Sequence, residues 1–491
     1  MVASRARVDG GRPPGLGPVV ACQGALHASL WDPGVGLDRL APGTTPGLDL
    51  RGFDLHSVRD SALGAFGDLG AGEPERAART IEAVLAQQYR APGRPWDATF
   101  RVTAEQDDPP GDEAVEWLHY DPNWRQFIGS ILALTLEEHE ARLPPALVPR
   151  VVEAIEAAVR REPEGRIPDW YTNPALMHAW LQGWVGRRVG APGLVAAGRA
   201  GAERTMARLA RHGDVDEYSS PTYDGVDLYA AALWNRHPAS DEEARWGETL
   251  LVTLGRRIGR LFHPGLGAMC GPYIRAYGLG LDRYVSLLGL WLVAAGVPPE
   301  DVLPPAINDH TVHVHDLAFA PLFAALAPTV VPHLVLATDL PRRHEQRFGP
   351  VEAVSVLGPD WATGAERGRR PIFSREQYVP VTVHARGPGP DRTVRWVGLG
   401  LGAPGTTVDA VADGQGGVEV TVGRDASSGP VSVRLLWSDR PTGAADGARL
   451  GPVTLSCAST PSSITEEADP GGWIATLTWD RPTSLVLAAH T

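Results

Sequence analysis

The stretch Phe127-Ile-Gly-Ser-Ile-Leu-Ala-Leu134 shows the pattern that decides the fold of the first two thirds of the chain. Its apolar residues recur at the spacings that place them on one face of an α-helix. The same period runs from about Ser57 to Ala337, interrupted by loops with Pro, Gly, Asn or Asp. This pattern predicts antiparallel helical hairpins packed side by side. Further helices are expected over residues 81–85, 151–159, 176–185, 194–209, 225–235, 242–262, 284–295 and 318–326.

A different pattern begins after about Pro341. Short apolar runs alternate there with Gly, Pro, Asp and Ser, which is typical of strands separated by tight turns. The spacing of these runs predicts an antiparallel β-sandwich of about 140 residues. The predicted strands lie at residues 351–354, 378–383, 394–397, 418–422, 431–435, 453–455 and 473–477.

A helical segment followed by a strand segment indicates separate domains rather than one mixed sheet. The length of 491 residues also exceeds the size at which a single hydrophobic core keeps growing. We therefore expect a multidomain α and β protein. Its parts are an irregular N-terminal segment over residues 1–56, a catalytic α/α toroid over 57–340, and an antiparallel β-sandwich over 341–491. The toroid is expected to be an incomplete barrel of helical hairpins around a groove.

The composition excludes several classes of function. A formal net charge of −13 argues against a general nucleic-acid binder, because phosphate contacts need Lys and Arg gathered on one face. The same charge disfavours adhesion to anionic membranes. No run reaches the roughly 18 uncharged apolar residues that span a bilayer.

The cysteines and the N-terminus bear on the compartment. Cys22, Cys270 and Cys457 are far apart and lack C-x-x-C spacing, so neither a zinc site nor a disulfide framework is expected. Residues 1–18 contain no apolar region of signal-peptide length. We expect a cytoplasmic protein.

The segment His212-Gly-Asp-Val-Asp-Glu-Tyr-Ser-Ser-Pro-Thr-Tyr-Asp-Gly-Val-Asp-Leu228 gathers acids, hydroxyls and two tyrosines just before an apolar helical run. Loops on a rigid scaffold commonly carry binding and catalytic groups. The alternative is an ordinary capped loop in which Asp224 or a neighbour caps the helix and the other acids are solvated.

Three more segments place polar and aromatic residues at the entry to a helix: His119-Tyr-Asp-Pro-Asn-Trp124, Asp169-Trp-Tyr-Thr-Asn-Pro-Ala-Leu-Met-His178 and Cys270-Gly-Pro-Tyr-Ile-Arg-Ala-Tyr-Gly278. In a toroid, helix ends on one side line the same mouth, so we expect these segments to converge. Their aromatic rings suit stacking on sugar rings, with packing in the core or rim as the alternative. The residues expected to bind substrate are Trp124, Trp170, Tyr171, Glu217, Tyr218, Tyr273, Tyr277, His313 and His315.

Three histidines, His310, His313 and His315, precede Asp316. Imidazole and carboxylate are common metal ligands. No H-E-x-x-H helix accompanies them, so a substrate-binding or helix-capping role is favoured over a metal, and no cofactor is expected. P-loop, G-x-S-x-G and dinucleotide motifs are also absent from the sequence.

The chain resembles the polysaccharide lyases built from an α/α toroid and a β-sandwich, particularly the heparinase II/III-like and alginate-lyase-like group. That family joins an Asn-containing, often His-containing helix start to a later D-G-x-x-x-E-x-S-P-x-Y-type segment. The counterparts here are Asn173 with His178, and Gly213 through Glu217, Ser220, Pro221 and Tyr223.

The resemblance implies β-elimination from a uronate-containing poly- or oligosaccharide. This reaction requires neutralisation of the carboxylate, for which Asn173 or Arg275 is expected. Tyr223 is expected to be the acid, and to serve also as the base in one version of the mechanism. His178 or a histidine of the 310–315 segment is the alternative base. Because Arg275 lies between Tyr273 and Tyr277, it is either an anion clamp or a structural arginine.

Two other hypotheses stay open. One is an α/α-barrel glycoside hydrolase or cyclase that uses Asp214, Asp216 or Glu217 for acid catalysis. The other is a carbohydrate-binding protein without catalysis. The favoured lyase hypothesis predicts an acidic oligosaccharide or a related polyhydroxy compound as the substrate.

Overall fold

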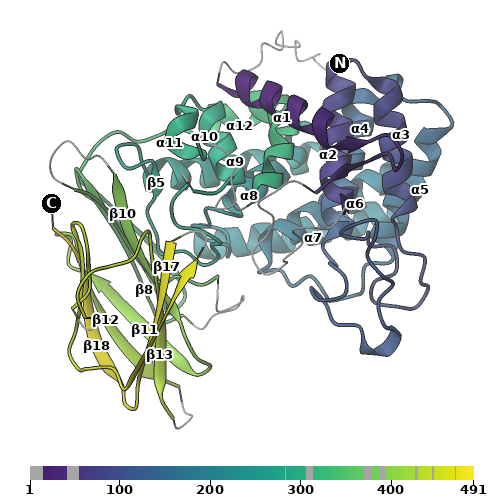
Figure 1. The fold of residues 1–491 in the computed structure, drawn as a ribbon. Helices are drawn as coiled ribbons and strands as arrows, with labels where there is room; N and C mark the ends of the chain where they lie inside the picture. The colour runs from purple at the N-terminus through teal and green to yellow at the C-terminus, as the bar shows by residue number, and fades with distance from the viewer. Residues whose placement is uncertain are drawn as a thin grey trace.

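The computed structural model describes residues 15–40, 55–281, 283–305, 313–369, 377–387, 393–425, 429–444, 447–469 and 472–490. Helices occupy the N-terminal part of these residues and antiparallel sheets the C-terminal part (Figure 1). This arrangement confirms the predicted fold class.

The helical part is a series of hairpins. In each hairpin the first helix contacts the second, and the four pairs are α2 (Val58–Ala71) with α3 (Pro74–Ala86), α4 (Trp124–His139) with α5 (Leu147–Arg160), α6 (Thr172–Arg188) with α7 (Pro192–His212), and α8 (Asp224–Arg236) with α9 (Asp241–Leu261). The first helices also contact one another in the order α2, α4, α6, α8, and α12 (Ala320–Val330) contacts both α8 and α2. The described residues also form α10 (Leu287–Ala294) and α11 (Pro299–Val302), and a further helix near the N-terminus that is described below.

Burial explains which helix of a hairpin lies inside. Helix α5 buries only one stripe, which includes Val151, Ile155 and Val159, whereas α8 is buried continuously from Asp224 to Trp234. A helix that is apolar around most of its circumference must have neighbours on all sides. Because every inner helix is followed by an outer helix that runs back, the inner helices run in one direction. Their N-termini therefore lie at the same end of the domain.

The N-terminal segment differs from the prediction. It was expected to be irregular, but it contains α1 (Leu16–Leu30), followed by the short strands β1 (Trp31–Asp32), β2 (Leu37–Arg39) and β3 (His56–Ser57). Helix α1 packs against α12, α2 and α10 (Figure 1). The helix has little amphipathic pattern of its own, so tertiary contacts stabilise it.

A buried ion-pair network fastens α1. Nδ1 of His27 lies 2.7 Å from Asp38 and Nε2 lies 3.1 Å from Asp68. A Cβ atom at position 64 would lie 2.3 Å from Cε1 of His27, so only Gly64 leaves room for the imidazole. Burial alone would lower the pKa of His27, but the hydrogen bonds and charges of Asp38 and Asp68 raise it to about 9.

This network predicts a pH dependence of stability. Because the pKa of His27 is about 9 in the folded state and 6.5 ordinarily, its contribution is complete below pH 6.5 and is lost as the pH rises to 9. We expect a loss of about 3 kcal/mol in the free energy of unfolding over this window. Denaturant titrations along this pH range measure it, with His27→Gln as the comparison. An equally steep decline in the variant would contradict the assignment to His27.

The C-terminal part is a sandwich of two antiparallel sheets. One sheet has the order β16-β17-β13-β10-β9-β8-β7-β6 and the other β11-β12-β18-β15-β14. The first sheet comprises β6 (Arg342–Phe348), β7 (Val351–Leu357), β8 (Trp361–Arg367), β9 (Val381–Arg386), β10 (Val394–Leu401), β13 (Val431–Trp437), β16 (Ser463–Asp469) and β17 (Gly472–Trp479). The second comprises β11 (Thr406–Ala412), β12 (Gly417–Arg424), β14 (Arg449–Leu450), β15 (Val453–Cys457) and β18 (Thr483–Ala489), and β4 (Phe262–His263) pairs with β5 (Ala268–Met269) elsewhere.

The helical part and the sandwich are in close contact. Phe348, Val351, Val379 and Trp396 of the sandwich belong to the same apolar cluster as the helical core. The loop after β5 is joined to the sandwich by two backbone hydrogen bonds of 2.9 Å between Tyr273 and Val379. The position of this loop therefore depends on both parts of the chain.

One apolar stretch and the distribution of surface charge bear on contacts with membranes and nucleic acids. The stretch Val314–His333 is long and apolar enough to cross a membrane, but 61% of its apolar window is buried inside the protein. We interpret it as a core segment, because α12 packs against α1, α2, α8 and α10.

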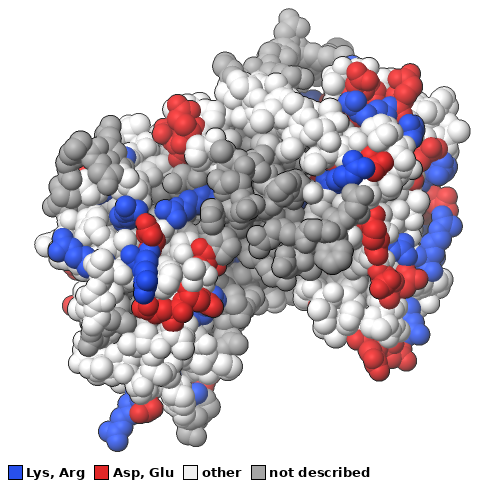
Figure 2. Space-filling model, viewed as in Figure 1, with Lys and Arg blue, Asp and Glu red and all other residues white. Residues whose placement is uncertain are grey.

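On the face shown in Figure 2, acidic and basic side chains lie interspersed among the described residues, so no continuous basic surface is formed by the described residues of that face.

Candidate functional site

The centre of the candidate site is a buried carboxylate, Glu217, in the loop between α7 and α8. Its Oε2 accepts hydrogen bonds from the backbone N–H of Asn173 at 2.9 Å and from Nδ2 of Asn173 at 2.6 Å. Its Oε1 accepts a hydrogen bond from Nη1 of Arg275 at 2.6 Å. Asn173 lies in the first turn of α6, where the helix dipole favours an anion. The structure thus brings together three residues that the sequence analysis singled out.

Arg275 lies among three tyrosines. Its Cζ is 3.6 Å from the ring centroid of Tyr223 and 5.3 Å from that of Tyr171. The Oη of Tyr223 is 3.0 Å from the Oη of Tyr277. The guanidinium therefore places a positive charge directly beneath the ring of Tyr223, whose hydroxyl is hydrogen-bonded to a second phenol.

Hydrogen bonds between two loops hold this arrangement in place. Oγ of Ser220 donates to the carbonyl of Arg275 at 2.5 Å and accepts from the backbone N–H of Tyr223 at 3.0 Å. The backbone N–H of Tyr277 donates to Oγ1 of Thr222 at 3.2 Å. Nε of Arg275 donates to Oε1 of Gln377 in the sandwich at 2.9 Å.

Burial and charge tune these groups. Burial, with a smaller contribution from Tyr277, raises the pKa of Tyr223 well above its ordinary value, although Arg275 opposes the shift. Burial alone would lower the pKa of Arg275, but the electrostatic interactions with Tyr223 and Glu217 outweigh it, and the pKa of this guanidinium is raised. Tyr223 is therefore a protonated phenol at neutral pH and Arg275 a permanent cation.

Two of the three predicted histidines lie beside the tyrosine pair. The rings of Tyr277 and His313 have centroids 4.7 Å apart, and those of His313 and His315 are 5.4 Å apart. Burial lowers the pKa of both histidines well below the ordinary value, so both imidazoles are neutral. His310 lies outside the described residues.

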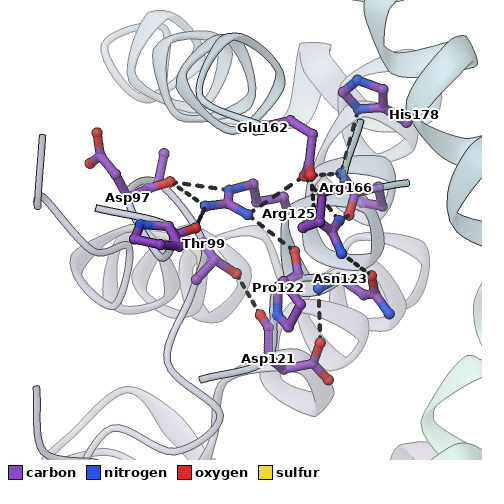
Figure 3. A network of polar contacts seen from close by, with 12 residues as sticks. Asp97, Thr99, Asp121, Pro122, Asn123, Arg125, Glu162, Arg166 and His178 are labelled. Carbon is purple, nitrogen blue, oxygen red and sulfur yellow. Dashed lines mark hydrogen bonds and ion pairs between the residues drawn. The ribbon is translucent and has the colours of Figure 1, made fainter. Parts of the chain in front are cut away.

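His178 lies in a different network. Its Nδ1 is 3.4 Å from Nε2 of Gln126, which donates to Glu162 at 2.8 Å (Figure 3). Burial lowers the pKa of His178 to about 4. No described hydrogen bond or ring contact joins it to Tyr223 or Arg275. Within the described contacts, His178 is a buried neighbour of the Arg125, Glu162 and Arg166 ion pairs (Figure 3).

The predicted aromatic residues divide into two groups. Trp124, Trp170 and Tyr171 are partly exposed, and the rings of Trp170 and Tyr171 stack with centroids 6.1 Å apart. Tyr218 and Tyr273, by contrast, are 1% and 0% exposed. The prediction that these two tyrosines bind substrate is therefore wrong, since their side chains are covered by the core. Tyr218 packs on His344 and Phe348, and Oη of Tyr273 donates to the carbonyl of Met269.

Three other acids of the 212–228 segment are paired with arginines, whereas both carboxylate oxygens of Asp227 are buried without a hydrogen-bond partner among the described residues. Asp216 receives two hydrogen bonds of 2.7 Å from Arg208, and Asp214 and Asp224 lie 3.5 and 3.0 Å from Arg257. Burial raises the pKa of Asp224 to about 7. Asp227 is also fully buried, and its pKa is raised well above the ordinary value, mainly by burial.

The residues predicted to form the site did not include three residues that contact it. Arg59 at the start of α2 is 3.2 Å from Asp316, Asn123 before α4 donates to Oη of Tyr171 at 2.8 Å, and Gln377 binds Arg275. Arg59 and Asn123 precede or begin inner helices. The expectation that helix starts converge would have identified them, whereas nothing in the local sequence singles out Gln377.

Solved structures with a similar fold include a chondroitinase AC lyase described in enzyme–oligosaccharide complexes. It aligns with 97% of this chain and 81% of its own, with a TM-score of 0.39 and 9% identity. The endoglucanase CelQ from Clostridium thermocellum, complexed with cellobiose and cellotriose, aligns with 98% of this chain and 93% of its own, with a TM-score of 0.29 and 9% identity.

A comparison with curated proteins gives no match. Residues 54–328 match the family described as Domain of unknown function (DUF8769), and they include Asn173, Glu217, Tyr223, Arg275 and His313. Because this match covers more than half of the 491 residues, the chain belongs to that family.

Proposed function

We propose that the chain is a carbohydrate-active enzyme that cleaves a uronate-containing poly- or oligosaccharide by β-elimination. The observation that carries the proposal is the Arg275 guanidinium 3.6 Å beneath the ring of Tyr223, whose hydroxyl is hydrogen-bonded to that of Tyr277. A fixed positive charge beside two phenols combines the charge stabilisation and the proton transfer that elimination requires. The resemblance to toroid polysaccharide lyases supports the same reaction.

Charge neutralisation is assigned to Arg275. Removal of the C5 proton places negative charge on the uronate carboxylate, and a fixed cation stabilises that charge most where water is excluded. Asn173 is 1% exposed and already donates its Nδ2 to Glu217, so we assign it a positioning role. Glu217, held by Asn173, in turn orients the guanidinium.

The two phenols divide the proton transfers between them. The pKa of Tyr223 is raised, so this phenol stays protonated, and in the proposed reaction it is the donor in the hydrogen bond to the Tyr277 oxygen. The proposed step requires an ionised Tyr277 oxygen, which takes the C5 proton while the C5–H electrons form the C4=C5 double bond and the C4–O4 bond breaks. Tyr223 then protonates the departing O4, and the proton on Tyr277 passes to Tyr223 along their hydrogen bond.

The hydrolase hypothesis has less support from the contacts. Glycoside hydrolysis needs two carboxyl groups on either side of the scissile bond, one of them able to act on water or sugar directly. Asp216 is bound by Arg208, Asp214 pairs with Arg257, and Glu217 accepts three hydrogen bonds and is 0% exposed. These acids are therefore engaged by protein groups.

The test is an elimination assay. Purified protein is incubated with a panel of uronate-containing polysaccharides, and the ultraviolet absorbance of the unsaturated product is followed. A rise in absorbance is the expected result. New reducing ends without absorbance would identify a hydrolase, and the absence of both products on every polymer would remove the enzyme hypotheses for this substrate class.

A further inference from the structure

His313, His315 and Asp316 form a compact cluster at the start of the 3-10 helix Val314–Phe319. Each offers one ligand atom, and these atoms all lie within 4.8 Å of one another. Nε2 of His315 is 3.4 Å from Oδ1 of Asp316, and Nδ1 of His313 is 3.7 Å from Oδ2. Ligands about 2.0–2.1 Å from a tetrahedral zinc ion are separated by about 3.3 Å, so small adjustments suffice.

The backbone brings these side chains together. His313 has a φ of 56°, a left-handed conformation that is unusual for a residue with a side chain. The chain turns at this point into the 3-10 helix, which places the His313 and His315 rings at a centroid distance of 5.4 Å. Non-glycine residues in this conformation are concentrated at functional sites, because other contacts must offset the strain.

An independent observation points to a ligand. Nε2 of His313 is buried, and no described residue forms a hydrogen bond with it. His313 itself is 5% exposed. A buried polar nitrogen without a partner costs free energy, so the His313 imidazole is not fully engaged by the described protein groups.

The contacts of Asp316 leave one of its carboxylate oxygens facing the histidines. Arg59 is the cation paired with Asp316, and it also pairs with Asp60, each at 3.2 Å. The contact of Arg59 with Oδ1 leaves Oδ2 of Asp316 directed to His313. Such a second contact commonly orients a metal-ligating carboxylate.

We propose that His313, His315 and Asp316 bind a divalent transition-metal ion of the zinc class. Two imidazoles and one carboxylate form a ligand set that suits Zn²⁺ and neighbouring metals rather than Mg²⁺ or Ca²⁺, which prefer oxygen ligands. The ion lies beside Tyr277, whose ring is 4.7 Å from that of His313. The inference goes beyond the proposed reaction and does not depend on it.

The test measures zinc binding to the full chain without substrate. The protein is freed of metal with a chelator and of any affinity tag, and is then titrated with ZnCl2 by calorimetry. We expect a single ion per chain, and no comparable heat with MgCl2. Substitution of residues that surround the ligands of a metal site usually lowers the metal affinity about 10–100-fold. H313Q/H315Q and D316N change proposed ligands themselves, so we expect a larger loss of zinc affinity in these variants.

Matched controls keep the result interpretable. H119Q alters a histidine in the loop before α4 and should bind zinc like the wild type. Circular dichroism establishes that each variant is folded, and D316N preserves the side-chain volume if the double variant unfolds. No zinc binding by the wild type, or equal binding by a folded D316N and H313Q/H315Q, would overturn the proposal. Either result leaves the elimination assay unaffected.

Discussion

Replacement of Tyr223 by phenylalanine is expected to lower turnover on a uronate substrate by about 10²–10⁴-fold, the usual contribution of a positioned acid or base. The substitution removes only the hydroxyl that lies 3.0 Å from Tyr277, and the ring can still pack over Arg275. Initial rates of ultraviolet absorbance measure the effect. The KM should change much less than kcat, because the lost proton transfer belongs to the transition state.

Tyr229 provides a matched control for this substitution. It lies in α8, the helix that Tyr223 precedes, is fully buried, and packs against Phe319 and Phe323. Tyr229→Phe removes the same atom from a tyrosine outside the site and should retain activity. Full activity of folded Tyr223→Phe would remove Tyr223 from the mechanism. An equal loss in both variants would indicate a general effect on folding.

Replacement of Glu217 by alanine is expected to lower the free energy of unfolding by about 3–5 kcal/mol, because it leaves the buried guanidinium of Arg275 without its carboxylate partner. Arg275 is 6% exposed, so water compensates little for the lost contact. The backbone N–H and Nδ2 of Asn173 also lose their acceptor. Denaturant titration at constant pH measures the change.

A double substitution separates the ion pair from the packing. In Glu217→Leu with Arg275→Met both charges are removed, and such exchanges of buried pairs are commonly neutral or mildly stabilising. We expect the double variant to be more stable than Glu217→Ala and to be inactive. A double variant less stable than the single one would contradict the assignment of the loss to the unpaired charge of Arg275, because both variants lack the acceptor of Asn173.

The inner helices were predictable because their apolar residues recur with one period over many turns. Helix α8, for example, was expected over residues 225–235 and spans Asp224–Arg236. Helix α1 was not predictable, because its contacts with α12, α2 and α10 and its His27 ion pairs come from residues distant in sequence. Tertiary contacts of this kind override local propensity.

Two of the strands that were missed differ in burial from the strands that were found. Strands β12 and β13 bury alternate or successive valines and were predicted from them. Strand β6 has the sequence RRHEQRF, and β16 is exposed at every residue. Both are edge strands of the eight-stranded sheet, where charged residues discourage pairing with other chains. Such strands lack the apolar signal on which prediction depends.

Part of the site could be predicted from the sequence, and the reason is geometric. Asn173, Tyr223 and Arg275 come together because helix starts and loops at one end of the domain meet. Sequence adjacency could not show which way each side chain points, and so Tyr218 and Tyr273 were predicted at the surface although they are buried. The partner of Arg275 in the sandwich, Gln377, is separated from it by about a hundred residues and has no local signal.

The hydrogen bonds between Tyr273 and Val379 and between Arg275 and Gln377 also bear on how this protein can change over evolution. The family match ends at residue 328, so both sandwich partners lie beyond the shared segment. Recombination that attached a foreign sandwich to this toroid would exchange the residues that hold the arginine loop. We therefore expect the two domains to be inherited as a unit, with changes at positions 377–379 accompanied by changes at 273–275.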